Sequence, residues 1–238
     1  MEFQKLVADD AAAAAQPLVE STITRAVSER GRAIVALPGG SSPIPLFRRL
    51  VAAELPWQQV WVTFGDERFV PLAHEHSNAG AAIRELLDKV PVPREQVFTW
   101  PILDDPLESA HAYAEELERT FGGFPTHDLN LLGLGDDGHT ASLFPGTGDV
   151  LLAGPTLAVR APDYASPGGW RLSMSARALS DSREVLFLVS GASKVPALRR
   201  TFGDDARAAA RSDAAFDSHP ARAVQAQERL TLVSDVEF

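Results

Sequence analysis

Residues 128–146 read DLNLLGLGDDGHTASLFPG and change character halfway along. The run from Leu129 to Leu134 carries no charged side chain and predicts a short buried strand. The eight residues 133–140 then contain three glycines, two aspartates, one histidine and one threonine. A glycine-dense loop at the end of a core strand is where α/β proteins bind ligands. His139 is therefore the leading candidate for a functional side chain.

The same loop matches the G-x-G-x-x-G pattern of dinucleotide-binding proteins at residues 133–138. Two features speak against that interpretation. A pyrophosphate would meet the carboxylates of Asp136 and Asp137 where unopposed backbone N–H groups are needed. Thr140 and Ser142 could cap a following helix, but this helix would have only about six residues before Pro145-Gly146. That is too short for the crossover helix that packs on the sheet in dinucleotide-binding proteins. We therefore expect no nicotinamide or flavin cofactor.

Composition places the chain among ordinary globular proteins. It has 238 residues, 45% hydrophobic and 23% charged, which suits one domain over residues 1–238. No apolar run is long enough for a membrane span, no export signal is visible and cysteine is absent, so we expect a cytoplasmic protein without disulfides. A net charge of −10 argues against nucleic-acid and membrane partners.

Apolar and helical patterns alternate along the chain and predict a doubly wound, mostly parallel sheet with helices on both faces. We expect strands near residues 3–7, 33–37, 60–64, 97–100, 129–134, 157–159, 171–175, 185–189 and 230–233. We expect helices from Asp9 or Asp10 to Arg30, from Pro43 or Pro45, over 77–87, over 106–121, from Lys194 to Arg200, and over 204–214. Pro17 implies a kink or a late start in the first of these.

Four loops at the ends of predicted strands carry the unusual residues: 39–42, 65–68, 133–140 and 191–194. In a parallel sheet these ends lie along one edge, so the loops can face one crevice. The first loop, Gly39-Gly40-Ser41-Ser42, is either a phosphate cradle or an ordinary β–α turn. One histidine beside anion-binding groups favours general-base attack of water, or proton transfer, on a phosphorylated small molecule.

Three further residue groups have open interpretations. Lysine occurs only at positions 5, 89 and 194, and Lys194 is either an anion ligand or a surface side chain. The cluster Asp66-Glu67-Arg68 is either an internal ion pair or part of a site. His74 and His76 have the spacing of a metal-binding pair, but no third ligand is evident, so we favour a solvated loop and expect no metal.

Five segments together resemble the 6-phosphogluconolactonases, within the wider family that includes glucosamine-6-phosphate deaminases. The segments are LPGGSSP at 37–43, GDERFVP at 65–71 with His74, Ser77, Asn78 and Gly80, GLGDDGHTASLFPG at 133–146, RLSMS at 171–175 and GASK at 191–194. The histidine segment is the most specific of them. The chain departs from the pattern at Pro38, where the family commonly has serine, and at 218–221, where we assign no role.

The resemblance implies hydrolysis of a sugar-phosphate lactone, and we separately expect a monomer or weak homo-oligomer. His139 would activate water against the lactone carbonyl, and Asp137 would help to hold the loop. Because a δ-lactone is already an activated ester, neither metal nor organic cofactor is implied. The residues implied in substrate binding are Gly39, Gly40, Ser41, Ser42, Asp66, Arg68, Asn78, Arg171 and Lys194, with the phosphate at the Gly-Ser loop, Arg68 and Lys194.

Two alternatives are kept. The deaminase branch usually reads Asp-Glu-Tyr where this chain has Asp66-Glu67-Arg68, so Arg68 favours the lactonase. A non-catalytic sugar-phosphate sensor generally carries a basic DNA-binding helix-turn-helix, and no such N-terminal module is present here.

Overall fold

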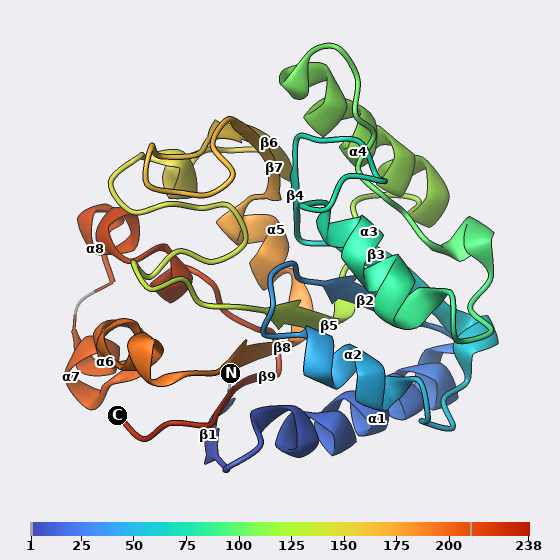
Figure 1. Cartoon of the computed structure of the whole chain (residues 1–238), viewed down its shortest axis with the longest axis horizontal. Coiled ribbons are helices and arrows are strands. Elements are labelled where there is room, and N and C mark those ends of the chain that lie inside the picture. Colours follow the sequence, from blue (N-terminus) through green and yellow to red (C-terminus); the bar gives the residue numbers. More distant parts are fainter. Residues whose placement is uncertain (1, 210) are drawn as a thin grey trace.

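The central element of the fold is a parallel β-sheet. The computed structural model describes residues 2–209 and 211–238, and within them six strands pair in the order β1-β9-β8-β5-β2-β3 (Figure 1). The strands are β1 Glu2–Val7, β2 Ala33–Leu37, β3 Val60–Phe64, β5 His127–Leu132, β8 Ser182–Val189 and β9 Arg229–Ser234. All neighbouring pairs are parallel, as the alternating sequence pattern predicts.

The order of the strands reverses between β2 and β5. From β2 the chain adds β3 on one side, and then places β5, β8 and β9 on the other. Loops that leave neighbouring strands at such a switch point diverge and open a crevice at the carboxyl ends of the strands. The loops after Leu37 and Leu132 border this crevice.

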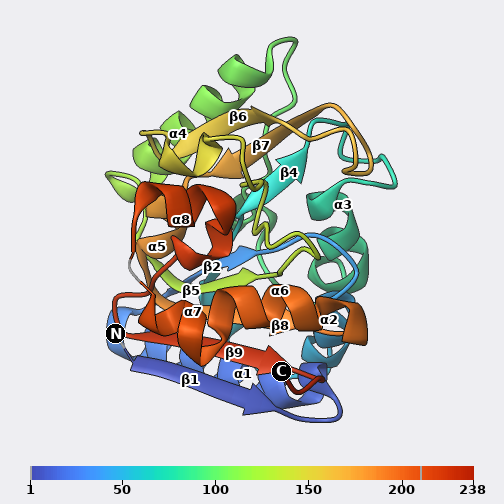
Figure 2. The ribbon, with the colours of Figure 1, turned by 90° about the vertical axis from the view of Figure 1, so that its left-hand side faces the viewer.

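Helices cover both faces of the sheet. On one face α1 (Ala11–Arg30) crosses β2, β5, β8 and β9, while α6 (Val195–Phe202) lies on the other, as Figure 2 shows. Asp10 caps α1 by accepting a hydrogen bond from the N–H of Ala13, and Gly31 ends it with φ 74°. The helix runs through Pro17 without a late start. The other α-helices are α2 Ile44–Leu50, α3 Asn78–Ala82, α4 Pro106–Phe121, α5 Ala176–Ser180, α7 Asp204–Ala208 and α8 Asp213–Ser218.

A second, antiparallel sheet was not foreseen. It consists of β4 (Asp66–Arg68), β7 (Trp170–Met174) and β6 (Thr156–Arg160) in that order, and α4 packs against it. The chain changes sheets at Gly65, whose N–H donates to Leu37 O at 3.1 Å and whose carbonyl accepts from Met174 N at 2.8 Å. The segment after β3 therefore forms a short strand where the sequence predicted only a loop.

Two other expectations were wrong. Residues 97–100 form no strand: Phe98 N donates to Val62 O at 2.8 Å, and then Trp100 turns inward and stacks on Tyr113 at 3.9 Å. These aromatic side chains fill the core, which explains their strand-like composition. The single helix expected over 204–214 is two helices, α7 and α8, because the backbone at Ala209 is extended and Ser212 caps the second helix. Position 210 lies outside the described residues.

The described part of the chain contains no helix that combines the length and the apolar character needed to cross a membrane.

Core residue His127 should make the stability of the fold sensitive to acid. Its ring is fully buried, with Nε2 2.9 Å from Thr63 Oγ1, and burial lowers the pKa of His127 to about 4. The unfolded chain then binds the proton more tightly than the folded chain, so stability falls as the pH drops from neutrality toward 4. Between pH 7 and pH 5 we expect the free energy of unfolding to fall by about 2 kcal/mol from this group. Urea unfolding of His127→Asn should show a correspondingly smaller fall, and an equal fall would contradict the assignment.

Candidate active site

The four loops singled out in the sequence meet at the switch point. They border a cavity of about 200 Å³, between the loop after β2 and the loop after β5. A second cavity of about 320 Å³ adjoins it and shares six lining residues with it. The shared residues are Asp66, Arg68, Gly135, His139, Ala141 and Lys194. The structure thus places the histidine, the two cations and the glycine-serine loop around one space.

His139 is held by Asp137 through a short side-chain contact. Its Nδ1 lies 2.6 Å from Asp137 Oδ1, and its backbone N–H donates to the same oxygen at 3.0 Å. A side chain at Gly135 would collide with this pair, because a Cβ there would lie 2.1 Å from the imidazole nitrogen. Nδ1 is therefore committed to Asp137, whereas Nε2 has no hydrogen-bond partner in residues 2–209 and 211–238.

Tyr164 is a site residue that sequence reasoning missed. Its hydroxyl donates to Asp137 Oδ2 at 2.9 Å, so each carboxylate oxygen of Asp137 has its own partner. Burial alone would raise the pKa of Asp137, but the bonds from His139 and Tyr164 outweigh it and lower the pKa to about 2. Tyr164 lies in a loop rich in proline and glycine, where no spacing or periodicity marks one residue above its neighbours.

No helix follows His139 in residues 140–148. Thr140 instead donates its hydroxyl to Gly133 O at 2.9 Å, and Leu143 N closes a turn onto Thr140 O at 3.0 Å. Ala141, inside this turn, has φ 48°, a left-handed conformation that side chains rarely adopt. The expected capping role of Thr140 and Ser142 is therefore wrong, and these side chains fasten the loop to its surroundings.

Asp66 and Asn78 form a buried layer beneath the cavity. Asp66 accepts hydrogen bonds from Asn78 Nδ2 at 3.0 Å and from Ser142 Oγ at 2.6 Å. The amide of Asn78 also donates to Asp66 O at 3.1 Å. Gly39 lies directly against Asn78, since a Cβ at this glycine would come within 1.8 Å of Asn78 Oδ1. Asn78 thus commits its donors to Asp66 and fixes the distance between α3 and the loop after β2.

Glu67 is an anchor rather than a partner of Arg68. Burial raises the pKa of Glu67, while backbone N–H groups at the start of α3 oppose the shift. The carboxylate accepts from the N–H groups of Asn78 at 2.7 Å and Ala79 at 2.9 Å, and from Ser77 Oγ at 2.9 Å. Neither side-chain oxygen pairs with the guanidinium of Arg68, which donates to His76 O at 3.0 Å. Arg68 is therefore free of a carboxylate partner within the described chain.

Three cations gather around the cavities. Arg68 and Arg171 are directly opposite each other on the antiparallel strands β4 and β7, and Lys194 lies at the N-terminus of α6. Burial, and then repulsion from Arg68, lowers the pKa of Arg171, whose exposed fraction is 3%. Like charges directly across a pair of strands destabilise it. An anion bound between the two arginines would relieve this repulsion.

The loop after β2 supplies neutral donors. Gly40 has φ 86°, which turns the backbone toward α2, and Ile44 N closes the turn onto Ser41 O at 3.2 Å. The hydroxyls of Ser41 and Ser42 make no hydrogen bond to the described residues. They line the first cavity, as Lys194 does, and remain available to a ligand.

His74 and His76 lie side by side in the loop before α3. Their rings lie 5.3 Å apart, and His74 Nδ1 accepts a hydrogen bond from His76 N at 3.2 Å. Among the residues that the structure describes, no group of three or more His, Cys, Asp or Glu side chains has the arrangement of a metal site.

A parallel α/β sheet with a histidine–carboxylate pair and clustered cations at its switch point defines a class of enzymes that act on small anionic substrates. Comparison with known sequences narrows this class. The profile described as "Glucosamine-6-phosphate isomerases/6-phosphogluconolactonase" matches residues 7–233. The chain belongs to this family.

Individual relatives agree with the family assignment. The chain is similar to the 6-phosphogluconolactonase of Synechocystis, with 39% identity over 91% of this chain and 88% of that protein. It is similar in structure to a 6-phosphogluconolactonase of Shewanella baltica, with a TM-score of 0.79, 25% identity and coverage of 98% and 97%. A monomeric glucosamine-6-phosphate deaminase shares the fold, with a TM-score of 0.78, 20% identity and coverage of 98% and 97%. The fold therefore does not separate the two branches.

Proposed function

We propose that the chain hydrolyses 6-phospho-D-glucono-1,5-lactone to 6-phospho-D-gluconate, the lactone-opening step of the oxidative pentose phosphate pathway. The observation that carries this proposal is the pairing of His139 with Asp137 beside the cluster of Arg68, Arg171 and Lys194. The similarity to a 6-phosphogluconolactonase at 39% identity supports the choice of substrate.

In the proposed mechanism His139 acts as a general base. Since Nδ1 is held by Asp137, the lone pair on Nε2 can take a proton from water as its oxygen attacks the lactone carbonyl carbon. The charge on Asp137 stabilises the imidazolium that forms. The imidazolium then returns the proton to the ring oxygen as the bond between that oxygen and the carbonyl carbon breaks. The products are the open-chain carboxylic acid and a free hydroxyl group.

The phosphate of the substrate would bind between Arg68, Lys194 and the loop 39–42. Arg68 and Lys194 border both cavities, so a phosphate between them leaves the lactone ring near His139. Arg171 adds a third positive charge from the floor of the second cavity. Asp66 and Asn78, which the resemblance places among the binding residues, would act by supporting this arrangement and by offering oxygen atoms to the sugar hydroxyls.

A direct test separates the lactonase from the deaminase branch. The purified chain should accelerate proton release from freshly prepared 6-phosphogluconolactone above the spontaneous rate, and it should release no ammonia from glucosamine 6-phosphate. This expectation rests on Arg68, which stands where deaminases usually have a tyrosine. Ammonia release without any effect on the lactone would assign the chain to the deaminase branch, and inactivity in both assays would favour a sensor.

Tyr164 is expected to act as a positioning residue. Loss of its hydroxyl in Tyr164→Phe removes one of the partners of Asp137. Because Tyr164 is exposed and solvent weakens the bond, we expect the loss to be worth only roughly 2- to 10-fold in rate. We expect kcat to fall by that amount while KM for the lactone is nearly unchanged. In a His139→Asn background the same substitution should have almost no effect, because it acts through the histidine. An additive loss in the double variant would disprove the role.

The proposal also covers organisation and setting. Residues 1–238 would form one domain, since a single buried cluster contains residues of both sheets, among them Leu131 of β5 and Leu172 of β7. A cytoplasmic monomer or weak homo-oligomer without nucleic-acid partners remains our expectation, and the net charge of −10 supports the last part.

A further inference from the structure

A larger cavity lies at the opposite edge of the sheet. Its volume is about 570 Å³, and its walls come from the segments that enter β2, β5 and β8. Because the strands are parallel, their entries and exits lie on opposite edges. The six residues of β5, at roughly 3.3 Å each, separate this cavity from His139 by about 20 Å. It is therefore distinct from the candidate active site.

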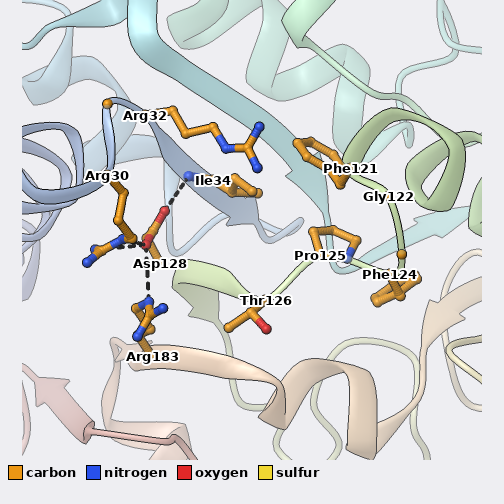
Figure 3. Close-up of a pocket in the computed structure, with 12 residues that line it drawn as sticks. Arg30, Arg32, Ile34, Phe121, Gly122, Phe124, Pro125, Thr126, Asp128 and Arg183 are labelled. Atoms are coloured by element: carbon orange, nitrogen blue, oxygen red, sulfur yellow. Dashed lines mark hydrogen bonds and ion pairs between the residues drawn. The ribbon is translucent and has the colours of Figure 1, made fainter.

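Three of the four charged residues that line this cavity are arginines. Arg30, Arg32 and Arg183 line it together with one acid, Asp128, in a chain whose net charge is −10 (Figure 3). Asp128 is buried and binds on three sides: Oδ1 lies 2.9 Å from Arg30 Nε and 3.6 Å from Arg183 Nε, and Oδ2 accepts from Ile34 N at 2.8 Å. This carboxylate holds two guanidinium groups in fixed positions at the wall.

Arg32 is the arginine of this cavity that has no carboxylate partner among the described residues. Arg30 also pairs with Glu29 at 2.6 Å, and Arg183 with Glu228 at 3.3 Å. Arg32 forms no ion pair with any residue that the structure describes, and its guanidinium lies 5.4 Å from the ring centre of Phe121. An exposed cation of this kind, next to two fixed arginines, attracts an anion. The planar fork of arginine suits phosphate oxygens in particular.

The rest of the wall is flat and apolar. Figure 3 shows Phe121, Pro125 and Phe124 along the side of the cavity facing Arg32 and Arg183. The ring of Phe121 is fixed from behind by Trp61 at 5.5 Å and Phe98 at 5.6 Å. A fixed aromatic ring beside an arginine is a stacking surface for a flat organic group. The volume is also that of a small-molecule site and exceeds what an inorganic ion fills.

We propose that this cavity binds an organic phosphate with a flat apolar part, the chemistry of a nucleoside monophosphate. The phosphate would lie among Arg32, Arg30 and Arg183, and the flat group would lie along Phe121 and Pro125. Neither the proposed lactone hydrolysis nor its substrate requires such a site.

The test is calorimetric binding of adenosine 5′-monophosphate to the intact chain. We expect a dissociation constant of roughly 1 mM or less, and at least about tenfold weaker binding of pyrophosphate, which lacks the flat group, and of adenosine, which lacks the charge. Arg32→Ala should weaken binding of the nucleotide roughly tenfold or more while leaving lactone hydrolysis unchanged. No detectable binding, or equal binding of pyrophosphate, would overturn the proposal.

Two variants make the result specific. Arg207 is a matched control, since it too is exposed and lies over a phenylalanine ring, that of Phe3 at 3.7 Å. Arg207→Ala should leave binding unchanged, and a loss equal to that of Arg32→Ala would reveal non-specific attraction and overturn the site. Lys194→Ala should also leave binding unchanged. If it abolished binding while Arg32→Ala did not, the nucleotide would occupy the active site and the proposal would fail.

Discussion

Replacing His139 by asparagine should lower kcat for 6-phosphogluconolactone hydrolysis by roughly 10²- to 10⁴-fold, the usual contribution of a general base. Asparagine can still hydrogen-bond Asp137, so the loop should keep its shape, but it cannot take a proton from water. The measurement is proton release under saturating substrate, corrected for spontaneous opening of the lactone. Product affinity, measured as inhibition by 6-phosphogluconate, should persist because the cations that we propose to bind the phosphate are unchanged.

His111 offers the matched control. It lies exposed on α4, where Nδ1 is 3.5 Å from Glu115 Oε1, and it borders neither cavity. His111→Asn should keep the parental kcat. A folded His139→Asn protein with near-parental kcat would remove the histidine from the mechanism.

The parallel sheet was predictable because its signals are local. Apolar runs such as Ala33–Leu37 and Val60–Phe64 are buried on both faces, and glycine or a polar cap ends most of the helices between them. Non-local choices were not predictable in the same way. The sequence of Asp66–Arg68 does not by itself predict pairing with β7, because the pairing depends on where Gly65 turns the chain. The aromatic segment 97–100 was misread because core-filling rings resemble strand composition.

The candidate site likewise combines features that are local in the sequence with features that depend on the tertiary fold. Gly135, Asp137 and His139 are close in sequence, so their cluster can be recognised from the order of the residues alone. Tyr164 reaches Asp137 across 27 residues, and the opposition of Arg68 to Arg171 arises from strand pairing. The buried contact of Gly39 with Asn78 is likewise tertiary. Motif spacing therefore locates the proposed general base, while the residues around it come together only when the chain folds.

Replacing Lys194 by alanine should lower kcat/KM for the phosphorylated lactone by roughly 10- to 150-fold, the value of a hydrogen bond to a charged group. Lys194 is 20% exposed at its side chain and borders both cavities. The slow hydrolysis of unphosphorylated gluconolactone should scarcely change, because that substrate has no phosphate for Lys194 to bind. Lys89→Ala is the control, since this exposed lysine pairs with Glu85 at 3.7 Å outside both cavities. Equal losses on both lactones would place Lys194 in the chemistry or the fold instead.

Asp136 sharpens the same prediction. Its Oδ1 lies 2.7 Å from Lys194 Nζ, yet its own side chain is 66% exposed, so the pair is weak and screened by solvent. A phosphate that binds Lys194 must compete with this carboxylate. Asp136→Asn should therefore raise kcat/KM for the phosphorylated lactone, by up to about fivefold given the usual strength of exposed ion pairs. A fall of the size expected for Lys194→Ala would mean that Asp136 positions the lysine, because the ammonium group would then need the carboxylate to reach the phosphate.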